Sequence, residues 1–152
     1  MRSEDGTFDQ QGFQNEYLVE EDNWIAAAEY ADSLGTDIIN TSLGYSTFNN
    51  PDQNHTYQDM NGISARISKA AEMASDKGMI VVVSAGNEGS SNWRYISAPA
   101  DAHNILAVGA VNSNRFRAGF SSTGPSFDNR VKPDVMAIGQ GTYLQTTNSQ
   151  IV

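Results

Sequence analysis

The run Ile80-Val81-Val82-Val83 constrains the fold of this 152-residue chain more than any other feature. Four consecutive β-branched residues are typical of a buried strand of a parallel sheet. A pattern with helical spacing precedes the run, and Gly78 separates the two. The same order occurs earlier in the chain, where Gly35 lies between a helical pattern and the β-rich residues 37–42. Helices that alternate with apolar strands predict an α/β fold with a parallel sheet and right-handed crossovers.

The spacing of apolar residues predicts two helices in the first half of the chain. The first begins after Asp22, a capping residue, and ends at Gly35; one face carries Trp24, Ala27, Ala28, Ala31 and Leu34. The second ends at Gly78, and one face carries Ile63, Ile67, Ala70, Ala71 and Ala74. Further strands are predicted over residues 105–111, 120–122, 134–137 and 142–145. We therefore expect a core over residues 21–145, after an acidic loop over residues 1–20.

Composition excludes several classes of function. The net charge is −9, from 9 basic and 18 acidic residues, which argues against a nucleic-acid partner. Seven of the acidic residues fall within residues 1–22, which we interpret as a solvated surface loop. The absence of cysteine excludes disulfides, thiolate zinc sites and cysteine nucleophiles. No apolar run approaches the roughly 20 residues of a membrane span. No Gly-x-Gly-x-x-Gly follows a first strand, so nucleotide binding is not indicated.

Small and polar residues follow two of the predicted strands. Ser42-Leu43-Gly44 follows the first strand, and Ser84-Ala85-Gly86-Asn87 follows the run of β-branched residues. In open parallel sheets, ligands bind at the carboxyl ends of the strands. Asn87 alone is also compatible with an ordinary turn, because asparagine between glycines is common there. The position nevertheless predicts a site at this edge of the sheet.

Five segments, taken in order, resemble the subtilisin-like serine protease family, the subtilases (peptidase S8). They are IINTSLG at 38–44, VVVSAGNEG at 81–89, ILAVGAV at 105–111, FSSTGP at 120–125 and KPDVMA at 132–137. The resemblance runs from about Trp24 to Leu144. It implies that the chain is a central section of the protease domain. The implied fold is a three-layer α/β/α arrangement with a mostly parallel sheet, left incomplete in this chain.

The resemblance implies a role for each residue at the strand ends. Asn87 matches the asparagine whose side-chain NH₂ donates to the oxyanion of the tetrahedral intermediate. Ser42, Leu43 and Gly44 match the segment that pairs with an extended peptide substrate. The other wall of the pocket for the residue before the cut bond would comprise Ser84, Ala85 and Gly86, with Glu88 nearby favouring a basic side chain. A cis Ala98–Pro99 bond is also expected.

The three triad residues of the family have no counterpart in the sequence. In the family, an aspartate and a histidine precede the first helix found here, and a serine follows the last strand. His55 and His103 are not followed by glycine as the family's base is, so we interpret both as surface histidines. Asp5-Gly6-Thr7 and Gly141-Thr142-Tyr143 resemble triad motifs only superficially. We therefore expect no peptidase activity from residues 1–152 alone.

Further expectations concern the complete protein. The resemblance implies a secreted or periplasmic endopeptidase that acts on an extended peptide and needs no cofactor. Asp52, Asn54 and Asp59 suggest calcium only weakly, because the glycine and late glutamate of an EF-hand are missing. Unpaired sheet edges predict that the isolated chain self-associates. An alternative is a non-catalytic subtilase-like module that binds peptide without cutting it.

Overall fold

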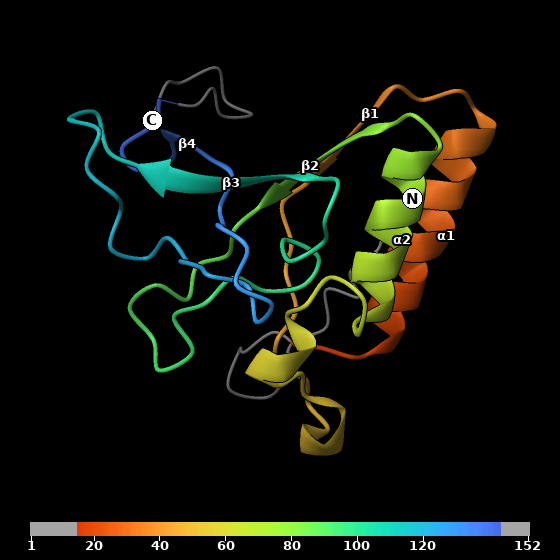
Figure 1. Cartoon of the computed structure of the whole chain (residues 1–152), viewed down its shortest axis with the longest axis horizontal. Helices are drawn as coiled ribbons and strands as arrows, with labels where there is room; N and C mark the ends of the chain where they lie inside the picture. The colour runs from red at the N-terminus through yellow and green to blue at the C-terminus, as the bar shows by residue number, and fades with distance from the viewer. Residues whose placement is uncertain (1–14, 144–152) are drawn as a thin grey trace.

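The structure is a computed structural model that describes residues 15–143 (Figure 1). Its elements alternate between helix and strand in the first half and consist of strands and loops in the second. In chain order they are α1 (Val19–Ser33), β1 (Ile38–Thr41), η1 (Pro51–Gln53), η2 (Tyr57–Asp59), α2 (Arg66–Asp76), β2 (Ile80–Ser84), β3 (Leu106–Val111) and β4 (Val135–Ile138).

The four strands form one parallel sheet in the order β1-β2-β3-β4. Helices α1 and α2 lie side by side, close to the β1 and β2 end of the sheet (Figure 1). Each helix ends just before a glycine with a left-handed backbone, Gly35 at φ +73° and Gly78 at φ +100°. The predicted α/β fold with a parallel sheet is confirmed.

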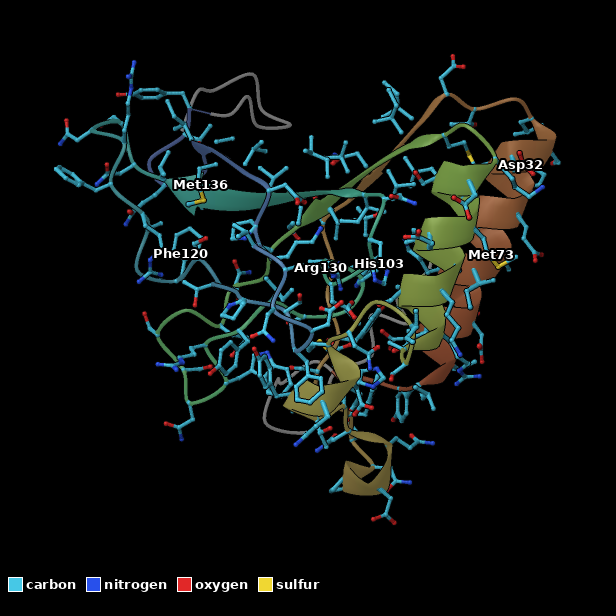
Figure 2. All side chains as sticks on the ribbon, viewed as in Figure 1. Asp32, Met73, His103, Phe120, Arg130 and Met136 are labelled. Carbon is cyan, nitrogen blue, oxygen red and sulfur yellow. The ribbon has the colours of Figure 1, made fainter. Side chains whose placement is uncertain are left out.

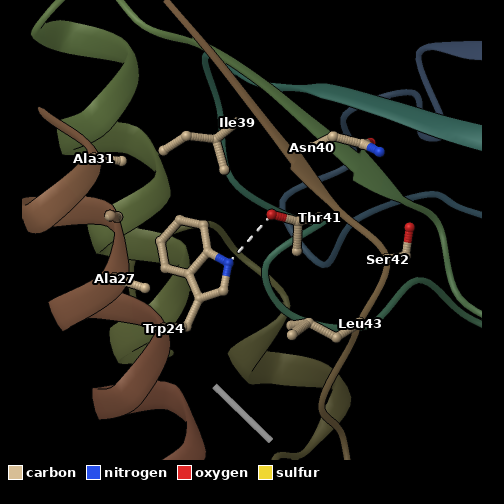
Figure 3. A pocket seen from close by; sticks show the side chains of 9 residues that line it. Trp24, Ala27, Ala31, Ile39, Asn40, Thr41, Ser42 and Leu43 are labelled. Carbon is tan, nitrogen blue, oxygen red and sulfur yellow. Dashed lines mark hydrogen bonds between the residues drawn. The ribbon is translucent and has the colours of Figure 1, made fainter. Parts of the chain in front are cut away.

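Trp24 joins α1 to the sheet. Its indole Nε1 donates to Thr41 Oγ1 over 3.1 Å, and its ring lies close to Ile39 (Figure 3). The neighbouring residues of the α1 face that line this region are alanines, Ala27 and Ala31 among them, so the helix can approach the strand closely. Trp24 is buried, as its spacing predicts.

The sheet is buried on one face and open on the other. Val81 and Val83 are fully buried, whereas Ile80 is 57% exposed and Ile38 and Leu106 are also exposed. The prediction of a buried strand at Ile80–Val83 is therefore confirmed for Val81 and Val83 and wrong for Ile80. The reason is that successive side chains of a strand point to opposite faces, and α1 and α2 supply cover for only one of them.

Several predicted boundaries differ from the structure. Helix α1 begins at Val19, so Asp22 lies in its first turn rather than at its cap. Acidic side chains in the first turn suit the positive end of the helix dipole, which explains the earlier start. Ile63 precedes α2 and is exposed. Tyr143 lies outside any strand, and residues 144–145 fall outside the described part of the chain.

The segment 120–122 is a turn rather than the predicted strand. Its backbone groups form hydrogen bonds with residues 86 and 89 instead of with a strand. Phe120 O accepts from Gly89 N–H over 2.8 Å, and Ser122 N–H donates to Gly86 O over 3.0 Å. These bonds connect it to the loop that follows β2. A segment paired with a loop cannot also pair with a strand of the sheet through the same groups.

Two acidic residues from the predicted solvated loop are buried. Glu20 and Glu21 have no exposed surface and lie in the first turn of α1. Glu21 Oε1 pairs with His55 Nε2 at 2.6 Å, and its Oε2 accepts from Ile67 N–H at 3.2 Å. Glu20 accepts from the Tyr45 hydroxyl at 3.3 Å. The interpretation of these positions as solvated is wrong, because their carboxylates connect α1 to two other segments.

Asp101 is a third buried carboxylate and gives a pH prediction. It accepts from Ser68 Oγ at 2.5 Å and from Gly62 N–H at 2.7 Å. Burial raises the pKa of Asp101 above its ordinary value, although these hydrogen bonds oppose the shift. The folded state therefore holds the proton more tightly than the unfolded state, so the contribution of Asp101 to stability falls as pH rises from the unfolded pKa through the folded pKa.

We expect Asp101→Asn to remove this dependence, so that the stability of wild type relative to the variant declines as pH rises through that window. Urea denaturation at a series of pH values measures the difference. Asp59 is the control with the opposite sign, because hydrogen bonds from the backbone and hydroxyl of Thr56 lower the pKa of Asp59. Its contribution is present above the unfolded pKa and is lost as pH falls through the folded pKa. If the stability difference from wild type changed with pH in the same direction for Asp101→Asn and Asp59→Asn, the prediction would be contradicted.

Candidate functional site: a cleft at the carboxyl ends of the strands

The segments after β1 and β2 line one cavity of about 220 Å³. The cavity lies where parallel strands present their carboxyl ends. Its described lining comprises Glu16, Ser42, Leu43, Gly44, Ser46, Thr47, Ser84, Gly86, Asn87, Glu88 and Ser97. We call this cavity the cleft. Of the residues predicted for the site, only Ala85 does not line it: it is buried, and its N–H donates to Val108 O.

Ser97 lies between the two walls of the cleft. A Cβ placed on Gly44 would lie 3.2 Å from Ser97 Cβ, and one placed on Gly86 would lie 3.2 Å from Ser97 Oγ. Reciprocal backbone hydrogen bonds between Tyr45 and Ala98 hold this segment beside the first wall. Sequence reasoning missed Ser97. The available signal was its proximity to the expected cis Ala98–Pro99 bond, which the structure confirms.

The loop that carries Asn87 is fixed by the turn at 118–122. Gly86 has φ +108°, and a Cβ there would lie 2.9 Å from Ser122 Oγ, so both conformation and space require glycine. Ser122 Oγ also accepts from Glu88 N–H at 3.0 Å. At Gly89 a Cβ would collide with the backbone of Ser121. The loop is therefore held on both sides of Asn87 by backbone contacts.

Asn87 itself is exposed at the edge of the cleft. Within residues 15–143, no hydrogen bond engages its side-chain amide. An amide has two N–H donors, and a fixed loop presents them at a constant position. The arrangement can donate to an oxygen that develops negative charge in the cleft.

Neither histidine lines the cleft. His103 is 37% exposed on its side chain and lies near Arg130 (Figure 2); both contact Asp128, at 3.6 Å and 2.7 Å. The surface interpretation suits His103. It is wrong for His55, whose side chain is 12% exposed and pairs with the buried Glu21 carboxylate. A buried carboxylate had to find a partner, and His55 is that partner.

Two oxygens of the weak calcium candidate, from Asn54 and Asp59, are used within the fold. Asn54 Oδ1 accepts from Phe48 N–H at 2.6 Å, and Asp59 Oδ2 accepts from Thr56 N–H at 2.7 Å. In the described range, no group of three histidine, aspartate or glutamate side chains is placed to hold a metal ion. Across that same range, no helix is both long and apolar enough to cross a membrane.

The fold and the cleft define an α/β domain with a cavity at the carboxyl ends of its strands. The model of the Subtilase family, peptidase S8, matches residues 6–151. The chain belongs to this family.

Curated relatives agree with the family model. Subtilisin DY of Bacillus licheniformis is 36% identical over 120 residues, which are 78% of this chain and 36% of that protein. Subtilisin E of Bacillus subtilis (strain 168) is 36% identical over 127 residues, 82% of this chain and 27% of that protein. The chain thus spans roughly a third of the length of these relatives.

Solved structures share the fold. The prenylagaramide maturation protease PagA superposes with a TM-score of 0.65 at 22% identity, over 87% of this chain and 42% of that one. The PatG macrocyclase in complex with peptide superposes with a TM-score of 0.58 at 22% identity, over 81% of this chain and 31% of that one.

Proposed function

We propose that this chain is the central, substrate-binding and oxyanion-stabilising part of a subtilisin-like serine endopeptidase. The observation that carries the proposal is Asn87, exposed at the edge of the cleft on a loop held by Gly86 and Gly89. Its side-chain N–H donates to the oxyanion that forms when the peptide carbonyl is attacked. A fixed donor stabilises this charge without reorganising, which lowers the barrier to the chemical step.

The substrate of the complete protein is an extended peptide. Ser42, Leu43 and Gly44 form one wall and pair with the peptide as an added strand. Ser84, Gly86 and Glu88 form the facing wall of the cleft. PatG, a structural neighbour, has been solved with a peptide, which supports this substrate class by analogy of fold. The reaction itself needs no cofactor, because nucleophile, base and oxyanion donor are side chains.

The Ser-His-Asp triad comes from parts of the complete protein other than residues 1–152. Within the described residues, His55 pairs with Glu21 and His103 with Asp128, and the cleft lining contains neither histidine. Among the described residues, a serine of the cleft therefore has no histidine base beside it, and a serine without such a base is a weak nucleophile. The complete protein is secreted or periplasmic, as proposed from its resemblance to subtilases.

Two assays test this function. We expect the complete protein to hydrolyse unstructured peptides, with the activity lost on treatment with a serine-directed inhibitor. We expect residues 1–152 alone to show no such hydrolysis, because general-base activation of the nucleophile is missing. Inhibitor-sensitive hydrolysis by the isolated chain contradicts the assignment of the triad to other parts of the protein.

A second candidate is a non-catalytic module that binds extended peptide. The cleft favours this candidate because its described lining contains no serine and histidine pair. An assay of the complete protein distinguishes the two functions: an endopeptidase cuts the peptide, whereas the module binds it and releases it uncut. Asn87 favours the endopeptidase, because a binder has no oxyanion to stabilise.

The isolated chain is also proposed to self-associate through the sheet. Ile38 and Ile80 are each 57% exposed on neighbouring strands, and β1 and β4 are the edge strands of the sheet that the described residues form. We expect light scattering to report a mass above that of the monomer, and Ile80→Lys to lower it. Ile63→Lys is the control, because Ile63 is 62% exposed but lies outside the sheet. A sharp monomer peak for the wild type contradicts the proposal.

A further inference from the structure

We propose that Asn61-Gly62 is a modification site, at which Asn61 converts to isoaspartate or aspartate when the turn that holds it opens. It is the one Asn-Gly pair of the 152-residue sequence. The pair lies between η2 and α2, in the turn over residues 60–64. Neither residue lines the cleft, so the chemistry of this site is independent of the proposed peptidase function.

The reaction uses atoms of these two residues and water. The backbone nitrogen of Gly62 forms a bond to Asn61 Cγ, its proton passes through solvent to the side-chain NH₂, and this group leaves as ammonia. The product is a succinimide ring. Water then opens the ring, giving aspartate where the bond between nitrogen and Cγ breaks and isoaspartate where the bond between nitrogen and the main-chain carbonyl breaks. No oxidant or reductant takes part.

The fold requires glycine directly after this asparagine. Gly62 has φ +82°, a conformation that residues with a side chain rarely adopt. A Cβ at this position would lie 2.6 Å from ring atoms of His103 and 3.0 Å from Asp101 O. The missing side chain also leaves the Gly62 nitrogen open to the approach of Asn61 Cγ. The residue that the turn needs is therefore also the one that permits the reaction.

Hydrogen bonds hold the Asn61 amide in the folded state. Its Oδ1 accepts from the backbone N–H groups of Ile63 and Ser64, each at 2.9 Å. Its Nδ2 donates to Gln58 O at 2.9 Å and to Ser64 Oγ at 2.8 Å. The attacking nitrogen has to approach the face of this amide, so the side chain must rotate out of these four hydrogen bonds before the ring can close.

The Gly62 nitrogen is restrained as well. Its N–H donates to Oδ2 of the buried Asp101 at 2.7 Å, and Asp101 Oδ1 accepts from Ser68 Oγ of α2. A carboxylate repels the negative charge that grows on the nitrogen as its proton leaves. Because several hydrogen bonds must break together, the open turn is rare. We expect the folded chain to react about 10²–10³ times more slowly than an unfolded peptide.

The product does not fit the closed turn. Isoaspartate adds a methylene to the backbone between residues 61 and 62, which displaces the Gly62 N–H from Asp101. Either product replaces the amide that donates to Gln58 O and Ser64 Oγ with a carboxylate, which has no donor. The new negative charge also lies near the buried Asp101 carboxylate, and like charges repel. Molecules that have reacted are therefore expected to be less stable.

The test follows conversion of Asn61 in the complete protein by peptide mapping and mass spectrometry, with a synthetic peptide of residues 57–66 as the unfolded reference. We expect the protein to convert about 10²–10³ times more slowly than the peptide. Ser64→Ala removes one hydrogen bond of the Asn61 amide at an exposed position, so the folded variant should convert about fivefold faster than wild type. Ser64→Thr keeps the hydroxyl and should convert at the wild-type rate. Asn61→Gln should abolish conversion, because its longer side chain would have to close a less favourable ring.

Ser113→Ala is the matched control, because Ser113 is an exposed serine in the loop after β3, away from the turn in sequence. Conversion of the folded protein as fast as that of the peptide overturns the proposal, and this comparison needs no variant to fold. No detectable conversion over a period long enough for the expected slow rate overturns it as well. Equal rates for folded Ser64→Ala and Ser113→Ala contradict the role of the turn.

Ion exchange separates the reacted molecules by their extra negative charge. Thermal unfolding of this fraction is expected at a lower temperature than that of the unreacted protein. Equal unfolding temperatures for the two fractions contradict the expected loss of stability.

Discussion

Replacing Asn87 with alanine in the complete protein is expected to lower kcat by about 10²–10³-fold, a magnitude taken from subtilisin, where such a donor has been removed. The side chain is exposed at the edge of the cleft, so its loss leaves no buried group unpaired. KM is expected to stay near the wild-type value, because the donor acts on charge that is present only in the transition state. Steady-state kinetics with one peptide measure both constants.

Asn92→Ala is the matched control, because Asn92 is an exposed asparagine nearby that does not line the cleft. Its kcat should equal that of the wild type. Thermal unfolding of both variants establishes that they are folded. A loss of kcat in Asn87→Ala no greater than in the control removes the oxyanion role, and an equal rise in KM instead assigns Asn87 to ground-state binding.

The helices and strands that could be predicted from the sequence are those whose ends are determined by neighbouring residues. The order helix, glycine, strand appears twice because Gly35 and Gly78 adopt the left-handed conformation that ends a helix. The position of the cleft follows from the same pattern, since parallel strands bring their carboxyl ends to one edge of a sheet. Ser42 and Asn87 belong to segments far apart in the chain, yet both line the cleft.

The features that were not predictable depend on contacts between distant segments. Nothing local to Glu16 indicates that it lines the same cleft as Asn87, and the local signal at Ser97 is limited to the neighbouring Ala98–Pro99 bond. Phe120 belongs to an apolar and β-prone run, but its carbonyl is bonded to the loop after β2 and the run forms a turn. Tertiary hydrogen bonds override local propensity in such places, as β-propensity is strongly dependent on context.

The acidic start of α1 shows that composition does not predict which charged residues are buried. A run of acidic residues is usually solvated, and Glu20 and Glu21 are fully buried instead. Each carboxylate is satisfied by a group from another segment: Tyr45 donates to Glu20, and His55 pairs with Glu21. Charge alone does not reveal burial, because burial depends on whether partners arrive from elsewhere in the fold.

Removing the partner of the buried Glu21 carboxylate is expected to cost more stability than any other histidine substitution in the chain. We expect His55→Ala to lower the free energy of unfolding by about 3–5 kcal/mol, because it leaves a buried charge without its partner. His103→Ala is the matched control: its pair with Asp128 is longer, 3.6 Å, and partly exposed, so its loss should cost at most about 1 kcal/mol. Urea denaturation, with all variants in the same oligomeric state, measures both values.

The position of His55 also connects this stability to the cleft. The backbone N–H of His55 donates to Ser46 O at 2.9 Å, and Ser46 lines the cleft. Phe48 contacts the His55 ring edge-on with ring centroids 5.5 Å apart, so the loop between them is packed against the buried pair. His55→Ala is thus expected to weaken peptide binding as well as folding, whereas His103→Ala should change neither. Equal losses of stability in the two variants would mean that the Glu21 carboxylate does not depend on its histidine.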